Sequence, residues 1–257
     1  MKIGPLLLIH ILFTGLASGQ NHSDSLSEHE LEKVAEDPTQ FVSRIEVFNE
    51  YQHYANGINL NITTLRSVIK IGRRFTTRIE IPFVYNSNTS TDHKQQGLSD
   101  ISFRLLGFRI YQSKKDAVSL SLEGSLNTAQ SPLLGSGKNV FVFMGTYTRV
   151  LKPKRTLLAG AFQQANSVSG DAARSTISFS KVQAVLLNFW SKKTWTVLAP
   201  ECFIDYVKGG VSMNLEGRIT YAPVPKINAW LKGGLGLFGS FIARYQWTVE
   251  IGGRLFL

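Results

Sequence analysis

The stretch from Val118 to Thr128, VSLSLEGSLNT, alternates between apolar and polar side chains along almost its whole length. Valine and leucine occupy every second position at first, and serines and Glu123 lie between them. Because successive side chains of a β-strand point to opposite faces, this pattern predicts a strand with one apolar and one polar face. The apolar face could contact the core of a soluble sandwich or the hydrocarbon of a membrane.

The same alternation recurs over most of the chain and predicts twelve strands between residues 41 and 257. We expect them near 42–54, 58–71, 75–86, 98–111, 117–128, 139–151, 156–166, 176–190, 195–207, 211–222, 227–238 and 241–257. Each strand with its connection then takes about 18 residues, which suits tilted strands that cross a bilayer. Segments 139–151 and 176–190 alternate poorly, so their faces stay unassigned.

The expected connections are of two kinds that alternate along the chain. One kind is tight and basic or proline-containing, at 72–74, 112–116, 152–155, 191–193 and 223–226. The other kind is often longer and polar, at 86–97, 129–138 and 166–175, although two late loops near 208–210 and 239–240 are short. Short turns on one rim and longer loops on the other are typical of outer-membrane barrels, and a sandwich has no reason to alternate in this way.

The polar faces carry arginine and glutamate in the middle of the strands, in near balance. Such residues suit a narrow barrel interior, where opposite charges pair across strands. The sequence therefore predicts an all-β fold, a closed antiparallel up-and-down transmembrane β-barrel of about 12 strands. The side chains expected to line its lumen are Arg44, Glu46, Arg78, Glu80, Arg104, Glu123, Glu216, Arg218, Glu250 and Arg254.

The apolar faces would then form the lipid belt of the barrel. Aromatic residues of outer-membrane barrels gather in girdles at the two membrane interfaces. The candidates for these girdles are Trp190, Trp195, Trp230, Trp247, Tyr147, Tyr206 and Tyr221. The alternative, a soluble sandwich, would need two sheets to bury every apolar face.

The chain before residue 41 predicts export. Residues 1–19 combine a short basic start, the apolar run PLLLIHILF and a small-x-small site at Ala17 and Gly19, which is the pattern of a cleaved signal peptide. No later segment has 18 consecutive apolar residues, so no transmembrane helix is expected. Residues 20–40 are acidic and polar and predict an N-terminal arm or plug on the periplasmic side. Residues 41–257 form the predicted barrel.

The formal net charge of +10 could indicate a nucleic-acid partner, but much of the excess lies in the tight turns. We therefore expect outer-membrane lipid, and not nucleic acid, beside these residues. The single cysteine, Cys202, can form no intrachain disulfide and is expected on a strand. No Cys/His cluster has zinc spacing, and LLGSGKN (133–139) lacks residues that a phosphate loop needs, so no metal and no cofactor are expected.

Three short motifs resemble a known family. Gly97-Leu-Ser-Asp100 precedes a predicted strand, the strand that ends in Leu122–Thr128 follows, and Gly135-Ser-Gly137 forms a loop. Together, over roughly residues 97–140, they resemble the outer-membrane family labelled MetA pathway of phenol degradation, whose members are described as transporters. The turn here reads Asn127-Thr128-Ala129 and lacks the proline and glycine of the family's pattern. The resemblance implies a Gram-negative outer-membrane barrel that passes small hydrophobic or aromatic solutes.

Three functions fit this sequence. The first is an outer-membrane channel or transporter for small solutes, inserted by the barrel-insertion machinery through a final strand that carries Phe256. The second is a closed barrel with a structural or partner-binding role. The third is a barrel enzyme acting on lipid, for which His53 would have to be the general base. Because no His-x-Ser lies on the predicted strands, we expect no enzyme.

Overall fold

The computed structural model describes residues 37, 39–55, 57–89, 93–152, 155–239 and 245–257. The predicted signal peptide, and the predicted arm up to residue 36, lie outside these residues. Among them no helix is long and apolar enough to cross a bilayer. The described strands are β1 Arg44–His53, β2 Ile58–Ile71, β3 Phe75–Asn88, β4 His93–Leu98, β5 Ser102–Gln112, β6 Asp116–Ser125, β7 Lys138–Lys152, β8 Thr156–Gly170, β9 Ser178–Phe189, β10 Thr194–Asp205, β11 Val211–Val224, β12 Ile227–Phe238 and β13 Trp247–Phe256.

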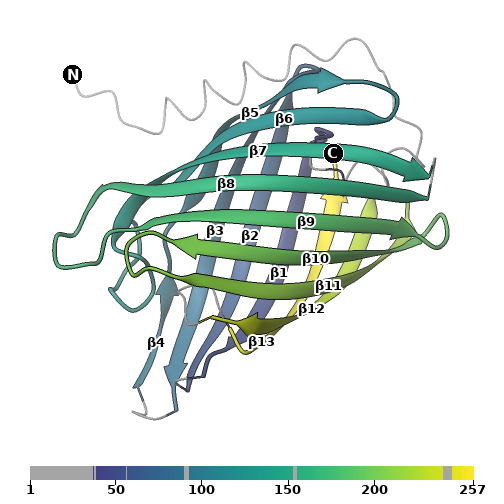
Figure 1. Cartoon of the computed structure of the whole chain (residues 1–257). Helices are drawn as coiled ribbons and strands as arrows, with labels where there is room; N and C mark the ends of the chain where they lie inside the picture. The colour runs from purple at the N-terminus through teal and green to yellow at the C-terminus, as the bar shows by residue number, and fades with distance from the viewer. Residues whose placement is uncertain (1–36, 38, 56, 90–92, 153–154, 240–244) are drawn as a thin grey trace, which may run out of the picture.

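The strands close into a single antiparallel barrel (Figure 1). The first strand pairs with the last, from Arg44 opposite Phe256 to His53 opposite Trp247, and its other edge pairs with β2. Around the rest of the ring each strand pairs with the next strand in sequence, except that β5 pairs with β3 and not with β4. Closure satisfies the backbone groups at both sheet edges, as hydrocarbon requires. The predicted up-and-down barrel is therefore confirmed.

The ring has twelve positions although the sheet has thirteen strands. The short strand β4 and the strand β5 share one position, because β5 pairs with residues 75–80 of β3 and β4 pairs with residues 83–88. The prediction of a loop over 86–97 was wrong for most of this segment. The polar side chains of 93–98 conceal a strand because they lie at the outer end of the barrel, where strands project beyond the lipid belt.

The two faces of the sheet differ as the alternation predicted. In β6 the side chains of Ser119, Ser121 and Glu123 are buried, whereas Leu120 and Leu122 between them are partly exposed on the outside. The same division extends around the ring and leaves a belt of large apolar side chains on the outer surface. A sheet of this kind is stable only where hydrocarbon covers that belt.

Two of the tryptophans predicted for the interfacial girdles lie inside the barrel instead. Trp195 is 0% exposed and packs with Leu157 and Leu187 in a small apolar cluster on the inner wall. Trp230 is 5% exposed and donates an indole hydrogen bond to Glu250. Each lies an even number of positions before a charged residue of the same strand, so its side chain points to the same face as that residue. The charged residues point inward, and the two tryptophans therefore do so as well. The other five candidates are exposed: Trp190, Trp247, Tyr147, Tyr206 and Tyr221.

The two rims carry the two kinds of connection that the sequence predicted. Tight turns join β2 to β3, β5 to β6, β9 to β10 and β11 to β12 at the end where β1 begins and β13 finishes. Their basic side chains are exposed, namely Arg73, Arg74, Lys114, Lys115, Lys192, Lys193 and Lys226. The longest described connection, residues 126–137, lies at the opposite rim.

Asp100 holds this long connection against the barrel. Its Oδ1 accepts hydrogen bonds from the backbone N–H groups of Thr128 and Ala129, at 3.2 Å each. Its Oδ2 accepts from the backbone N–H and the hydroxyl of Ser136, at 2.6 and 2.7 Å. Position 135 has no room for a Cβ because the Ala129 side chain and the Asp100 carboxylate occupy that space. The residues that carried the family resemblance thus form one loop anchor.

Replacing Asp100 with asparagine should release the connection over residues 126–137. In the variant an amide oxygen replaces one carboxylate oxygen, and an NH₂ group, which cannot accept a hydrogen bond, replaces the other and faces its donors. The lost hydrogen bonds lower the local stability of the loop by roughly 2 kcal/mol. Chymotrypsin should then cleave after the exposed Leu133 in the folded protein. Asp171→Asn is the matched control, because Asp171 lies in another loop of this rim and accepts a backbone N–H of its own turn. Equal cleavage of both variants would contradict this role of Asp100.

Candidate functional site

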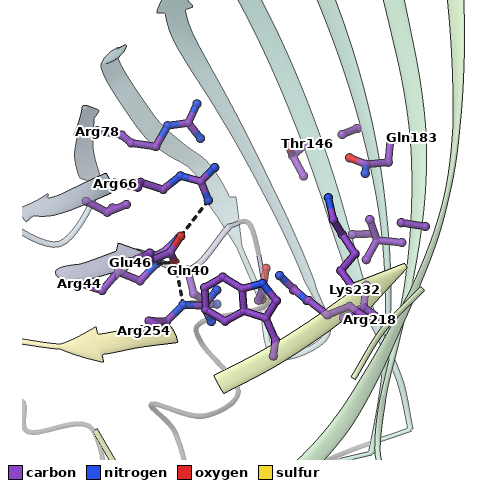
Figure 2. Close-up of a pocket in the computed structure, with 18 of the residues that line it drawn as sticks. Gln40, Arg44, Glu46, Arg66, Arg78, Thr146, Gln183, Arg218, Lys232 and Arg254 are labelled. Atoms are coloured by element: carbon purple, nitrogen blue, oxygen red, sulfur yellow. Dashed lines mark hydrogen bonds and ion pairs between the residues drawn. The ribbon is translucent and has the colours of Figure 1, made fainter. Parts of the chain in front are cut away.

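The interior of the barrel contains a cavity of about 420 Å³. Long charged side chains from β1, β2, β3 and β13 line one side, and mostly short side chains from β7 to β10, with the longer Gln183 among them, line the other (Figure 2). The short ones are Thr146, Ala159, Ala161 and Ala199. The cavity exists because these small residues stand across the ring from the arginines.

A ladder of arginine and glutamate side chains covers the charged wall. Glu46 bridges Arg44, Arg66 and Arg254, with distances of 2.7, 2.8 and 2.7 Å. From Arg66 the ladder continues across neighbouring strands, each step joining opposite charges at 2.7–2.9 Å. In order from β2 its further members are Glu80, Arg78, Glu123 and Arg104. The ladder contains five arginines and three glutamates, so it holds more cations than anions.

Glu46 is the most enclosed member of this arginine ladder, with a side chain 1% exposed. Its Oε1 accepts hydrogen bonds from Nε of Arg44 and of Arg254, and its Oε2 accepts one from Nη1 of Arg66. A buried carboxylate is tolerated only when it is paired and hydrogen-bonded in this way. Glu46 therefore fixes three strands of the closure, β13, β1 and β2, to one another.

A second cluster with the opposite charge excess surrounds Lys232. The Lys232 Nζ lies 3.1 Å from Glu50, 3.4 Å from Glu216 and 3.0 Å from Glu250. One lysine thus meets three carboxylates. Glu50 follows Glu46 by four positions on β1, so this acidic cluster lies about 13 Å further along that strand, toward the long-loop rim.

Tyr245 adds a hydroxyl to the acidic cluster from the segment just before β13. It is 3% exposed and donates a hydrogen bond to Glu216. Burial and the negative charge of Glu216 raise the pKa of Tyr245, so the hydroxyl stays protonated and remains a donor. Tyr245 therefore reaches from this rim into the lumen.

Two aromatic rings lie between the arginine ladder and the acidic cluster. Phe48 separates Glu46 from Glu50 on β1, and Trp230 lies over Gly252, which separates Glu250 from Arg254 on β13. A Cβ at position 252 would collide with the indole ring. The ring centroids of Phe48 and Trp230 are 6.3 Å apart. Three guanidinium carbons stand over these rings, Arg66 at 4.7 Å from Phe48, and Arg254 and Arg218 at 5.2 and 5.9 Å from Trp230.

The chain just before β1 crosses the end of the lumen at the short-turn rim. Thr39 is fully buried, its Oγ1 lies 3.2 Å from Oγ1 of Thr148, and its carbonyl accepts a hydrogen bond from Arg109 at 2.9 Å. Arg109 also donates to the side chain of Gln40 at 3.2 Å. Since Thr148 and Arg109 belong to β7 and β5, this segment contacts the wall well away from β1.

The structure places the ten charged residues predicted from the sequence on the inner side of the sheet. Eight line the cavity, namely Arg44, Glu46, Arg78, Arg104, Glu216, Arg218, Glu250 and Arg254. Glu80 and Glu123 stand within the arginine ladder. The residues predicted to line the lumen did not include Arg66, Lys232 or Glu50, and Trp230 was assigned to the outer girdles. Strand parity could have found Arg66, which alternates with the outward Leu65, and Lys232, which is the only charged residue of β12.

Comparison with solved structures identifies the fold as that of known outer-membrane barrels. The COG4313 outer membrane channel from Pseudomonas putida F1 superposes with a TM-score of 0.71 at 12% identity, covering 84% of this chain and 96% of that one. The NanC porin gives 0.62 at 9% identity, covering 83% and 100%, and the KdgM porin gives 0.57 at 8%, covering 82% and 98%. No family model and no curated protein matches the sequence, so the MetA-pathway label is not confirmed.

Proposed function

We propose that the protein is a narrow channel in the outer membrane of a Gram-negative cell. The observation that carries this proposal is the cavity enclosed by a closed barrel whose outer surface is apolar and whose inner surface is charged. A twelve-stranded barrel is intermediate between eight-stranded barrels filled by side chains and wide porins. The fold it shares with structures named as an outer membrane channel and as porins supports the same role.

The orientation follows from the rims. Outer-membrane barrels place short turns in the periplasm and longer loops outside the cell. We therefore assign the basic turns and the N-terminus to the periplasmic side. The predicted plug of residues 20–40 fits the same end, because Thr39 and Gln40 already cross the lumen there. We also propose that the barrel-insertion machinery acts on β13, the final strand, whose outward residues are apolar.

We propose that the channel transports small solutes, among them hydrophobic or aromatic compounds. The family resemblance suggested these compounds, and the short, largely apolar wall of the cavity supports them. Lipid hydrolysis is not proposed. The Nδ1 of His53 lies 2.6 Å from Oδ1 of Asn59, and its ring stacks on Trp247 at 5.6 Å, so the observed contacts direct this imidazole to an amide and an indole.

Planar-bilayer recording of the purified chain tests the channel. We expect discrete single-channel currents, and liposomes that contain the protein should swell in small solutes. A folded barrel that shows neither current nor swelling would overturn the channel and favour a closed barrel with a structural or partner-binding role. Heat-modifiable migration on gels establishes that the tested sample is folded.

Lys232→Gln should move the channel toward cation selectivity. The variant leaves Glu50, Glu216 and Glu250 without their shared lysine, so the lumen becomes more negative near its middle. The reversal potential in a KCl gradient should shift toward the potassium potential. Lys192→Gln, in an exposed turn, removes the same charge outside the lumen and should shift it little. Equal shifts in both variants would contradict conduction past Lys232.

A further inference from the structure

The cavity combines three kinds of recognition surface in a fixed order along the strands. The arginine ladder comes first from the short-turn rim, the Phe48 and Trp230 rings follow, and the acidic cluster of Lys232 lies beyond them. Across the ring stands the wall of short side chains. A ligand in this cavity therefore meets guanidinium groups, aromatic faces and a small apolar surface at once.

The two charged layers differ in their donors and in their charge balance. Each guanidinium has five N–H donors, so the five ladder arginines carry many more donors than three carboxylates can accept. In the acidic cluster, Lys232, Tyr245, Thr248 and Trp230 already donate to the three carboxylates. The ladder holds two more arginines than glutamates, whereas the acidic cluster holds one lysine and three glutamates, so an incoming anion is attracted to the ladder. Guanidinium recognises a planar carboxylate best.

The body of the ligand follows from the rings and the opposite wall. Guanidinium groups stand over the Phe48 and Trp230 rings, and a guanidinium plane accepts a flat ring on its face as an aromatic ring does. Across the cavity, six of the eight lining side chains are apolar, Ala161, Val197 and Ala199 among them, and the other two, Thr146 and Gln183, are uncharged. A flat apolar body therefore satisfies both walls better than a polyol would.

We propose that the cavity is a binding site for aromatic carboxylates, with the carboxylate on the arginine ladder and the ring between Trp230 and the short wall. This inference rests on the proposed channel function and names its substrate class. Arg218 and Arg254 become the specificity residues at the boundary between ladder and ring, because both stand over Trp230.

Calorimetric titration of the full chain in detergent at low salt tests the site. The probe is benzoate, compared with acetate, benzyl alcohol and benzylammonium, which lack the ring, lack the charge or reverse it. Benzoate should bind at least about tenfold more tightly than each of the other three, since charge-assisted hydrogen bonds and ring stacking both contribute. Tighter binding of benzylammonium would make the acidic cluster the recognition element and overturn the proposal, as would equal binding of benzoate and acetate.

Two substitutions test separately how the aromatic ring and the charge contribute to benzoate binding. Trp230→Leu should reduce benzoate affinity about tenfold while leaving the weak acetate affinity unchanged, and Trp230→Phe should restore most of the loss. Arg218→Gln should weaken benzoate and acetate together. Heat-modifiable migration shows whether each variant folds. A folded Trp230→Leu variant with wild-type benzoate affinity would overturn the proposal.

Titration and conductance together distinguish the two proposals. Benzoate binding by a barrel that carries no current would support the proposed binding site and contradict the proposed channel. Current through a barrel that binds benzoate and acetate equally would support the proposed channel and contradict the proposed binding site. In the full proposal benzoate binds and also reduces the chloride current at concentrations near its dissociation constant.

Discussion

Replacing Glu46 with glutamine is expected to destabilise the barrel by about 3–5 kcal/mol, the cost of breaking a buried ion pair from one side. The Glu46 side chain is 1% exposed and compensates Arg44, Arg66 and Arg254 together. Its loss leaves three guanidiniums enclosed with no shared carboxylate. Because these arginines lie on β1, β2 and β13, the damage falls on the strands that close the ring.

Unfolding in urea, followed by tryptophan fluorescence and by migration on unheated gels, measures this loss. Asp116→Asn is the matched control, because Asp116 also faces an arginine, at 3.8 Å, but its side chain is 28% exposed and that of Arg149 is 55% exposed. An exposed pair of this kind contributes about 0–1 kcal/mol. Similar unfolding midpoints for the two variants would show that Glu46 does not hold the closure.

Ala161→Trp is expected to abolish most of the channel current. Ala161 lines the cavity beside Thr146 and Gln183, opposite the arginine ladder, so an indole at this position enters the open space. Because conduction depends on pore width, single-channel conductance should fall below about a fifth of its original value. The arginine ladder itself is untouched, so the barrel should still fold.

Ala184→Trp provides the control for this blocked variant. Ala184 lies on β9 next to Gln183, but its side chain is exposed on the outer face. An indole there meets lipid and should leave the conductance unchanged. If the Ala161→Trp protein is folded and conducts normally, ions do not pass through this cavity and the channel proposal fails.

Much of the barrel could be predicted because its signal is local. Val118 to Ser125 shows the reason: each side chain's face follows from its position in a strand of period two, whatever pairs with that strand. The same rule placed Glu216 and Arg218 inside and Ile219 outside. Trp195 and Trp230 were assigned to the outer face because of their residue type, and not because of their position in the alternation, and that assignment was wrong. The loop predicted over 86–97 failed because polar residues also form strands beyond the lipid belt.

The partners within the candidate site could not be predicted in this way. Lys232 meets Glu50 across 182 positions of sequence, and Arg254 meets Glu46 across 208. These contacts depend on the register between β1, β12 and β13, and a shift by two residues would keep every face and change every partner. The cavity depends in addition on which strands stand opposite one another, since Ala161 on β8 faces the arginines only in a ring of this size.

By itself, the sequence determined the class of fold, the two rims and the side of the sheet on which the ten predicted charges lie, because period and turn composition are properties of neighbouring residues. Only the tertiary structure decided that Glu46 holds three arginines, that Lys232 holds three glutamates, and that Trp230 lies between these two groups. Those arrangements arise from ring closure and strand register, which set distances between residues that no local pattern relates.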